Sequence, residues 1–217
     1  MAKVGALTPP GQSDDRRCAH RASMVLRRAK LVCQSGEYLT LIRDVSELGV
    51  GLGFLHDVPP EPRTLLKLAN DLTYPVERVW TGKRQAGYRF ASQVLLDEFV
   101  REHSNFPSRP IRMEFSAPVR VIEGRDRFDA RLLDLSCEGA KITCSGEFAD
   151  GRMVSLDIEG LPQQLAQVRW SEGKRIGLKF HAPIETEELA NCALFHQPFD
   201  KTRSSGFTKL LAKARAA

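Results

Sequence analysis

Two six-residue stretches, DVSELG at residues 44–49 and DLSCEG at residues 134–139, share the pattern Asp-x-Ser-x-x-Gly and lie ninety residues apart. Landmarks further along the chain keep the same interval. They are Trp80 and Trp170, Gly87 and Gly177, and Phe90 and Phe180. Similarity at a fixed spacing is the sequence signature of a repeated structural unit. The sequence therefore predicts two homologous domains.

The repeat sets the expected domain boundaries. We expect one domain at residues 16–103 and a second at 107–197, joined by a short polar stretch. Residues 1–15 are predicted to be a disordered N-terminal segment, and residues 198–217 a basic C-terminal tail. Whether that tail is disordered, docks on the domains, or contacts a partner or acidic lipid stays open.

Each repeat has the periodicity of strands. Short β-rich runs are separated by Ser-Gly, Pro-Pro and Thr-Gly turns, which is typical of antiparallel sheets. Five or six such strands favour a closed barrel, because closure leaves no exposed sheet edge. Apolar residues at helical spacing follow each repeat, at 91–103 and 186–197. The predicted fold is mainly all-β, with two tandem antiparallel β-barrels, each followed by a short capping α-helix, and with Trp80 and Trp170 in the cores.

Composition narrows the class of protein. The chain is 42% hydrophobic, and its net charge of +5 suits anionic partners without identifying one. Its five cysteines are an odd number and form no Cys-x-x-Cys pair, which argues against a disulfide framework and a structural zinc site. The start lacks the apolar core of a secretion signal, and no stretch has the ~20 apolar residues of a membrane helix. We expect a cytoplasmic protein with no integral membrane segment, metal or cofactor.

The first repeat carries an arginine element before its Asp-x-Ser-x-x-Gly turn. Arg17-Cys18-Ala19-His20-Arg21 has arginine at both ends and is preceded by Arg16. This combination resembles the PilZ domain family, whose pattern is Arg-x-x-x-Arg, then Asp/Asn-x-Ser-x-x-Gly, then a Gly-x-x-Phe strand. The resemblance implies a PilZ-like barrel that binds cyclic di-GMP (c-di-GMP). The implied ligand residues are Arg16, Arg17, Arg21, Asp44, Ser46 and Gly49.

The chemistry of these residue types suits such a ligand. Paired guanidinium groups can fork onto phosphate oxygens or onto the O6 and N7 atoms of guanine. A carboxylate such as that of Asp44 can accept hydrogen bonds from the N1 and N2 edge of guanine, and the Ser46 hydroxyl can bond a base or a phosphate. Gly49 allows close approach of the backbone or completes the turn.

The second repeat departs from the family pattern. Its turn is intact, but alignment of Arg112 with Arg21 puts Ser108 where the leading arginine belongs, with Arg109 one position away. We therefore expect a degenerate second domain that contacts the first domain or a partner. A second, weaker site there would use Arg109, Arg112, Asp134, Ser136 and Gly139.

Other interpretations stay beside the receptor hypothesis. An Asp-x-Ser turn can be capped by its own side chain with no ligand role, and the arginines can be a solvated charge run. The chief alternative function is a ligand-independent PilZ-like interaction or scaffold protein. A nucleic-acid binder lacks the expected stacking aromatics, and no catalytic motif appears, so we expect neither nucleic-acid binding nor an enzyme. The predicted output is a conformational change that regulates an unidentified protein partner in motility, biofilm or polysaccharide output.

Overall fold

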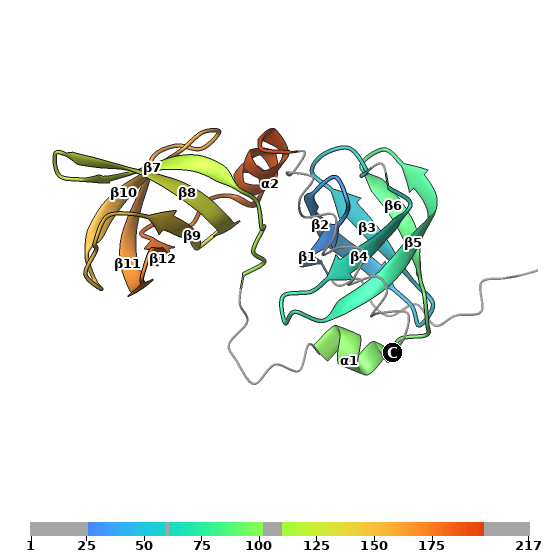
Figure 1. The fold of residues 1–217 in the computed structure, drawn as a ribbon. Coiled ribbons are helices and arrows are strands. Elements are labelled where there is room, and N and C mark those ends of the chain that lie inside the picture. The colour runs from blue at the N-terminus through green and yellow to red at the C-terminus, as the bar shows by residue number, and fades with distance from the viewer. Residues whose placement is uncertain (1–25, 60, 102–109, 198–217) are drawn as a thin grey trace, which may run out of the picture.

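The computed structural model describes residues 26–59, 61–101 and 110–197, and these form two closed six-stranded antiparallel barrels (Figure 1). In both, the order around the barrel is first, second, third, sixth, fifth and fourth strand. The predicted fold class of two tandem antiparallel barrels, each followed by a short helix, is confirmed.

The first barrel is built from short strands, and a helix of six residues follows it. Its elements are β1 (Arg27–Val32), β2 (Glu37–Val45), β3 (Gly49–Phe54), β4 (Arg63–Lys67), β5 (Thr73–Gly82), β6 (Gln85–Phe90) and α1 (Leu96–Arg101).

The second barrel repeats this order and ends in a longer helix. Its elements are β7 (Ala117–Glu123), β8 (Asp126–Ser136), β9 (Gly139–Cys144), β10 (Met153–Ile158), β11 (Gln164–Glu172), β12 (Arg175–Phe180) and α2 (Thr186–Phe195). A capping box fixes the start of α2, since Glu185 and Glu188 each accept a backbone N–H of the first turn. Among the described residues, no helix is long and apolar enough to cross a membrane.

The ninety-residue register of the sequence holds in three dimensions. The ladder between the second and third strands shifts at Ile42/Asp44 in the first barrel and at Leu132/Asp134 in the second. The ladder between the fifth and sixth strands shifts before each tryptophan, at Arg78/Trp80 and at Val168/Trp170. Bulges bend a strand and redirect its side chains. The bulges therefore redirect the aspartate and the tryptophan at equivalent positions in both barrels.

The two tryptophans do not lie in the cores, so that prediction was wrong. Trp80 is 50% exposed, and Trp170 is half-buried. A Cβ on Gly87 would lie 2.0 Å from Trp80 Nε1, and one on Gly177 would lie 2.2 Å from Trp170 Nε1. Each indole thus lies on the outside of its sheet, over a glycine of the neighbouring strand. This contact explains why the tryptophan and the glycine recur together in both repeats.

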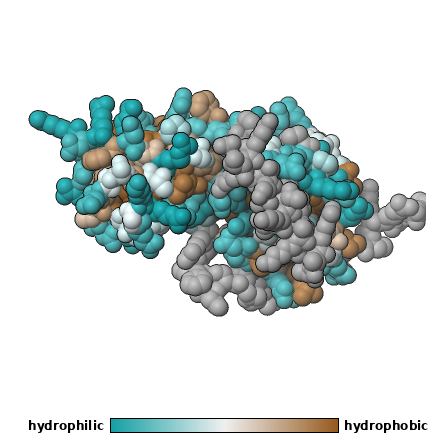
Figure 2. All heavy atoms as spheres, in the orientation of Figure 1, coloured by the Kyte–Doolittle hydropathy of each residue, from teal (hydrophilic) through white to brown (hydrophobic). Residues whose placement is uncertain are grey.

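Each barrel is filled by its own apolar side chains, and the clusters touch where the barrels meet. Leu39 of β2 belongs to the core of the second barrel, and Leu194 of α2 contacts the core of the first. Helix α2 lies between the two barrels in Figure 1. On the face seen in Figure 2, hydrophobic side chains appear in separate patches among hydrophilic ones.

Candidate functional site

The Asp-x-Ser-x-x-Gly turn is capped by its own serine in both barrels. The Ser46 hydroxyl donates to the Gly49 carbonyl at 3.3 Å and accepts the Gly49 N–H at 3.1 Å. The Ser136 hydroxyl likewise donates to the Gly139 carbonyl at 3.2 Å and accepts the Glu138 N–H at 3.3 Å. These bonds belong to the turn itself. Serine is thus required here to shape the loop between two strands.

The glycine that ends each turn is explained by close approach of the neighbouring strand. A Cβ on Gly49 would lie 2.8 Å from the Tyr88 carbonyl oxygen, and one on Gly139 would lie 2.1 Å from that of Leu178. Any larger residue would therefore push the third strand away from the sixth.

Asp134 is the centre of a charge cluster on the second barrel. Its side chain is only 6% exposed, and it accepts Arg112 Nη1 at 3.1 Å and Lys141 Nζ at 2.7 Å. The guanidinium of Arg112 is itself half exposed. Because Asp134 holds one edge of that group, the remaining N–H donors are fixed in direction and stay available to a ligand.

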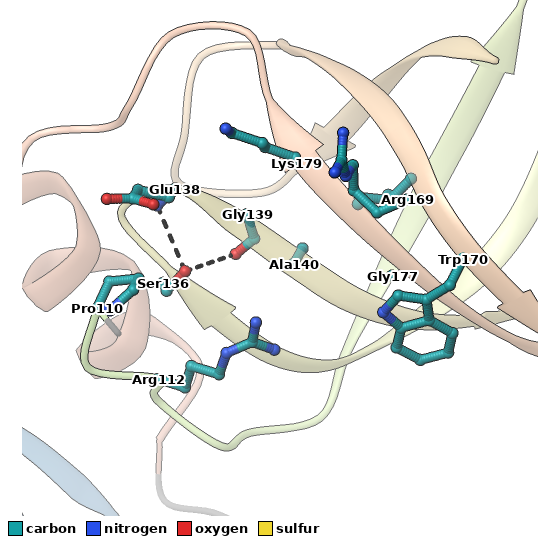
Figure 3. A pocket seen from close by; sticks show the side chains of 11 residues that line it. Pro110, Arg112, Ser136, Glu138, Gly139, Ala140, Arg169, Trp170, Gly177 and Lys179 are labelled. Atoms are coloured by element: carbon teal, nitrogen blue, oxygen red, sulfur yellow. Dashed lines mark hydrogen bonds between the residues drawn. The ribbon is translucent and has the colours of Figure 1, made fainter. Parts of the chain in front are cut away.

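A pocket of about 230 Å³ adjoins this cluster (Figure 3). Gly139 and Ala140 form its floor, Arg112 lies on one side with Arg169 and Lys179 opposite, and Trp170 lies at one end. The other residues that line it are Pro110, Ser136, Glu138, Gly177 and Leu178. Three cationic side chains and one carboxylate leave a surplus of positive charge, so the pocket suits an anionic ligand with a planar group.

The structure brings together Arg112, Asp134, Ser136 and Gly139 of the predicted second site. Sequence reasoning missed the cations Arg169 and Lys179 and the lysine at 141. A signal for two of them was present. Arg169 directly precedes the repeated tryptophan, and Lys179 directly precedes the repeated phenylalanine. Phe180 is buried, so strand alternation turns Lys179 outward.

The equivalent face of the first barrel is built differently. Asp44 is exposed, and it pairs across the ladder with Gly51 where Asp134 pairs with Lys141. Among the described residues, the Asp44 carboxylate has no ion-pair partner. The other arginines that the sequence predicted as ligand residues, Arg16, Arg17, Arg21 and Arg109, lie outside the described residues.

The cysteines that the structure describes are buried in the two barrels. Cys33, Cys137, Cys144 and Cys192 are all free and buried. Burial raises the pKa of Cys137, which lies within the second turn, and raises the pKa of Cys33 and Cys192 to about 12. These thiols therefore stay protonated near neutral pH. Within the described ranges, no group of three His, Cys, Asp or Glu side chains could hold a metal ion.

Comparison with known families identifies the second barrel. Residues 99–195, which contain β7–β12 and α2, match the family model of the PilZ domain. The second barrel is a PilZ domain. The pocket described above therefore lies on a PilZ domain, at its Asp-x-Ser-x-x-Gly turn. The first barrel has the same strand order as this PilZ domain.

Solved structures that match parts of this chain include proteins of three bacteria. The Borreliella burgdorferi PlzA protein in complex with c-di-GMP is 14% identical, with a TM-score of 0.34 over 77% of this chain and 86% of that one. The Bacillus subtilis inhibitor of motility (MotI/DgrA) is 10% identical, with a TM-score of 0.33 over 79% and 96%. YcgR of Escherichia coli in complex with c-di-GMP is 11% identical, with a TM-score of 0.26 over 88% and 84%. No curated protein matches the chain.

Proposed function

We propose that this chain is a receptor for c-di-GMP. The observation that carries the proposal is the cationic pocket of the PilZ domain, with Arg112 held on Asp134 beside Arg169, Lys179 and Trp170. The ligand has two phosphates and two guanines. Arginine can fork onto the phosphate oxygens or the O6 and N7 edge of guanine, and the open face of a half-buried indole can stack on a base.

The size of the pocket supports a ligand that is only partly enclosed. Its volume of about 230 Å³ lies below the roughly 300–1,000 Å³ of sites that surround a small molecule. A cyclic dinucleotide would place one half in the pocket and leave the other half accessible. That exposed half is available to a second ligand molecule or to another part of the chain.

The first barrel offers a second site, which we propose from the sequence. Arg17 and Arg21, with Arg16, would supply cations to the outer face of this barrel, where Gly51 and Val79 stand in place of Lys141 and Arg169. Asp44 would accept hydrogen bonds from the edge of guanine. Without Arg17 or Arg21, binding at this barrel should weaken by roughly 1.5–3 kcal/mol, the range for hydrogen bonds that involve charged groups.

The mode of action that follows is regulation by binding. Ligand on one or both barrels would change the surface offered to a protein partner, and the chain would act without catalysis. The four cysteines that the structure describes are free and buried, which supports a reducing compartment, so we place the protein in the cytoplasm.

Calorimetric titration of the full chain with c-di-GMP tests the proposal, with GMP as the control ligand. We expect saturable binding with a Kd of about 1 μM or tighter, which corresponds to about −8 kcal/mol. GMP should compete poorly because it has one base and one phosphate. Absence of saturable heat at high protein concentration would remove the receptor proposal and favour a ligand-independent scaffold.

A further inference from the structure

A buried ion pair of the first barrel lies against the second barrel. Lys30 of β1 is 4% exposed and Glu37 of β2 is 8% exposed, and Lys30 Nζ lies 2.8 Å from Glu37 Oε2. Removing two charges from water is costly, and their mutual attraction offsets the cost only where further hydrogen bonds satisfy both groups. The other hydrogen bonds of Lys30 and Glu37 therefore indicate the role of the pair.

Those partners belong to the segment that leads into the second barrel. Lys30 Nζ donates to the Arg112 carbonyl oxygen at 2.6 Å, and the Glu114 N–H donates to Glu37 Oε2 at 2.6 Å. Beyond α2, Gln197 Nε2 donates to the Glu37 carbonyl oxygen at 2.6 Å. The ion pair thus holds the backbone on both sides of Met113.

The opposite edge of the same segment is held by the second barrel. The Met113 N–H donates to the Leu135 carbonyl oxygen at 2.7 Å, and the Leu135 N–H donates to that of Met113 at 2.9 Å. In an extended chain, the carbonyl of one residue and the N–H two residues later point to the same side, while the residue between them points both groups to the other side. Residues 112–114 therefore form an extended segment between the ion pair and β8, to which Met113 is joined by an isolated β-bridge.

This placement connects the first barrel to the ligand pocket. Leu135 directly follows Asp134, which holds the Arg112 guanidinium at 3.1 Å. The backbone of Arg112 is fixed by Lys30, and its side chain is fixed by Asp134. A change in the docking of the two barrels would shift the arginine that lines the pocket.

The ion pair is not needed to build a barrel of this type. At the equivalent positions, ninety residues on, the second barrel has Arg120 and Arg127, two exposed side chains of like charge. The pair is present only in the barrel whose β1 and β2 meet the other domain. It therefore serves the interface between domains.

We propose that Lys30 and Glu37 are positioning residues for Arg112, so that the first barrel completes the dinucleotide site of the second. The inference rests on the proposed c-di-GMP function. Because coupling between two equilibria is reciprocal, ligand in the pocket strengthens docking of the barrels by the same factor by which docking strengthens binding.

The test uses the full chain with the double substitution Lys30→Met and Glu37→Leu. Replacement of a buried ion pair by apolar residues of similar size is often neutral for stability, so the variant is expected to fold. It should bind c-di-GMP about tenfold more weakly at the second barrel, the order expected for lost hydrogen bonds to charged groups. In an Arg112→Ala background the same double substitution should have no further effect, because its influence passes through Arg112. The matched control, Arg120→Met with Arg127→Leu, should bind like the wild type.

A second measurement needs no ligand. Amide hydrogen exchange at Met113 and Leu135 should accelerate at least tenfold in the Lys30→Met, Glu37→Leu variant and stay unchanged in the control. Unchanged exchange, or an effect on affinity that persists in the Arg112→Ala background, overturns the inference. A wild-type protein that fails to bind c-di-GMP refutes the proposed function instead, and exchange then decides whether the ion pair holds the segment.

Discussion

The two barrels share strand order, ladder register and both bulges, yet their equivalent outer faces differ in chemistry. Where the second barrel has Lys141, Arg169 and Lys179, the first has Gly51, Val79 and Arg89. Where the second has Glu138, the first has Leu48, which is 56% exposed. The backbone fixes which positions face outward, and the side chains there decide whether the face attracts an anion.

The charges on β5 and β11 increase this difference between the two outer faces. In the first barrel, Glu77 of β5 forms ion pairs with Arg89 at 3.4 Å and with Arg63 at 3.2 Å. The equivalent of Glu77 in the second barrel is Gln167, which has no charge, and Lys179 forms no ion pair with any residue that the structure describes. The cation at this position is thus neutralised on one barrel and available on the other.

The largest expected effect comes from the glycine that ends each turn. Gly139→Ala should destabilise its barrel by about 3 kcal/mol and Gly49→Ala by about 1 kcal/mol, since overpacking typically costs 1–3 kcal/mol and the approach is closer at Gly139. Urea unfolding of each variant measures the loss. Gly82→Ala is the control, because the atoms nearest to its Cβ would belong to the flexible side chain of Gln85. Equal losses at the two turns would show that the barrels tolerate this contact alike.

The next effect concerns the arginines. Arg112→Ala and Arg21→Ala should each weaken c-di-GMP binding at their own barrel by about 2 kcal/mol, or about thirtyfold, with the melting temperature of the ligand-free protein nearly unchanged. Calorimetry of both single variants and the double variant gives affinity and stoichiometry. Loss of all binding in Arg112→Ala, with the fold intact, would assign the ligand to the second barrel alone. Loss of all binding in Arg21→Ala would assign it to the first.

A reciprocal exchange tests whether the outer cation sets the difference between the faces. Arg169→Val should weaken binding at the second barrel about fivefold, and Val79→Arg should strengthen it at the first by a similar factor, because exposed charges contribute up to about 1 kcal/mol. Both effects should shrink as salt is raised. Titrations at two ionic strengths measure them. Arg125→Val, an exposed arginine that does not line the pocket, serves as control. A salt-independent change would mean that shape, and not charge, separates the barrels.

The smallest effect is a pH dependence confined to the first barrel. His56 is buried there, and burial lowers its pKa below 6.5, whereas the second barrel has Gly146 at the equivalent position. Well above pH 6.5 the imidazole is neutral whether the chain is folded or unfolded. As pH falls from 6.5 towards the lower pKa of the folded state, the unfolded chain binds the proton first, so stability is lost.

The melting temperature measured from pH 7.5 to 5 should therefore fall more steeply for the wild type than for His56→Asn. Asparagine can keep the hydrogen bond that His56 Nδ1 makes with the Asp57 carbonyl oxygen at 2.7 Å. Identical slopes for the two proteins would show that other groups account for acid sensitivity.

The repeat, the barrels and the turns could be predicted from the sequence, because they depend on local patterns. Strand alternation, turn residues and a fixed ninety-residue interval act over a few positions at a time, and they specified the two barrels and the helix after each. The structure also places Arg112 and residues of the second turn around one pocket, and their role as ligand residues stays a prediction. The positions of the two tryptophans were predicted wrongly. Hydrophobicity alone does not reveal that an indole lies outside the sheet, over a glycine of the neighbouring strand.

Only the tertiary structure decided which charges meet. Asp134, Lys141, Arg169 and Lys179 come from β8, β9, β11 and β12, so their grouping depends on how a closed barrel brings distant strands together. The burial of Lys30 and Glu37 depends on a contact with residues more than seventy positions away. Pairings between separate elements follow from packing geometry, because residues far apart in the chain come together only when the barrel closes.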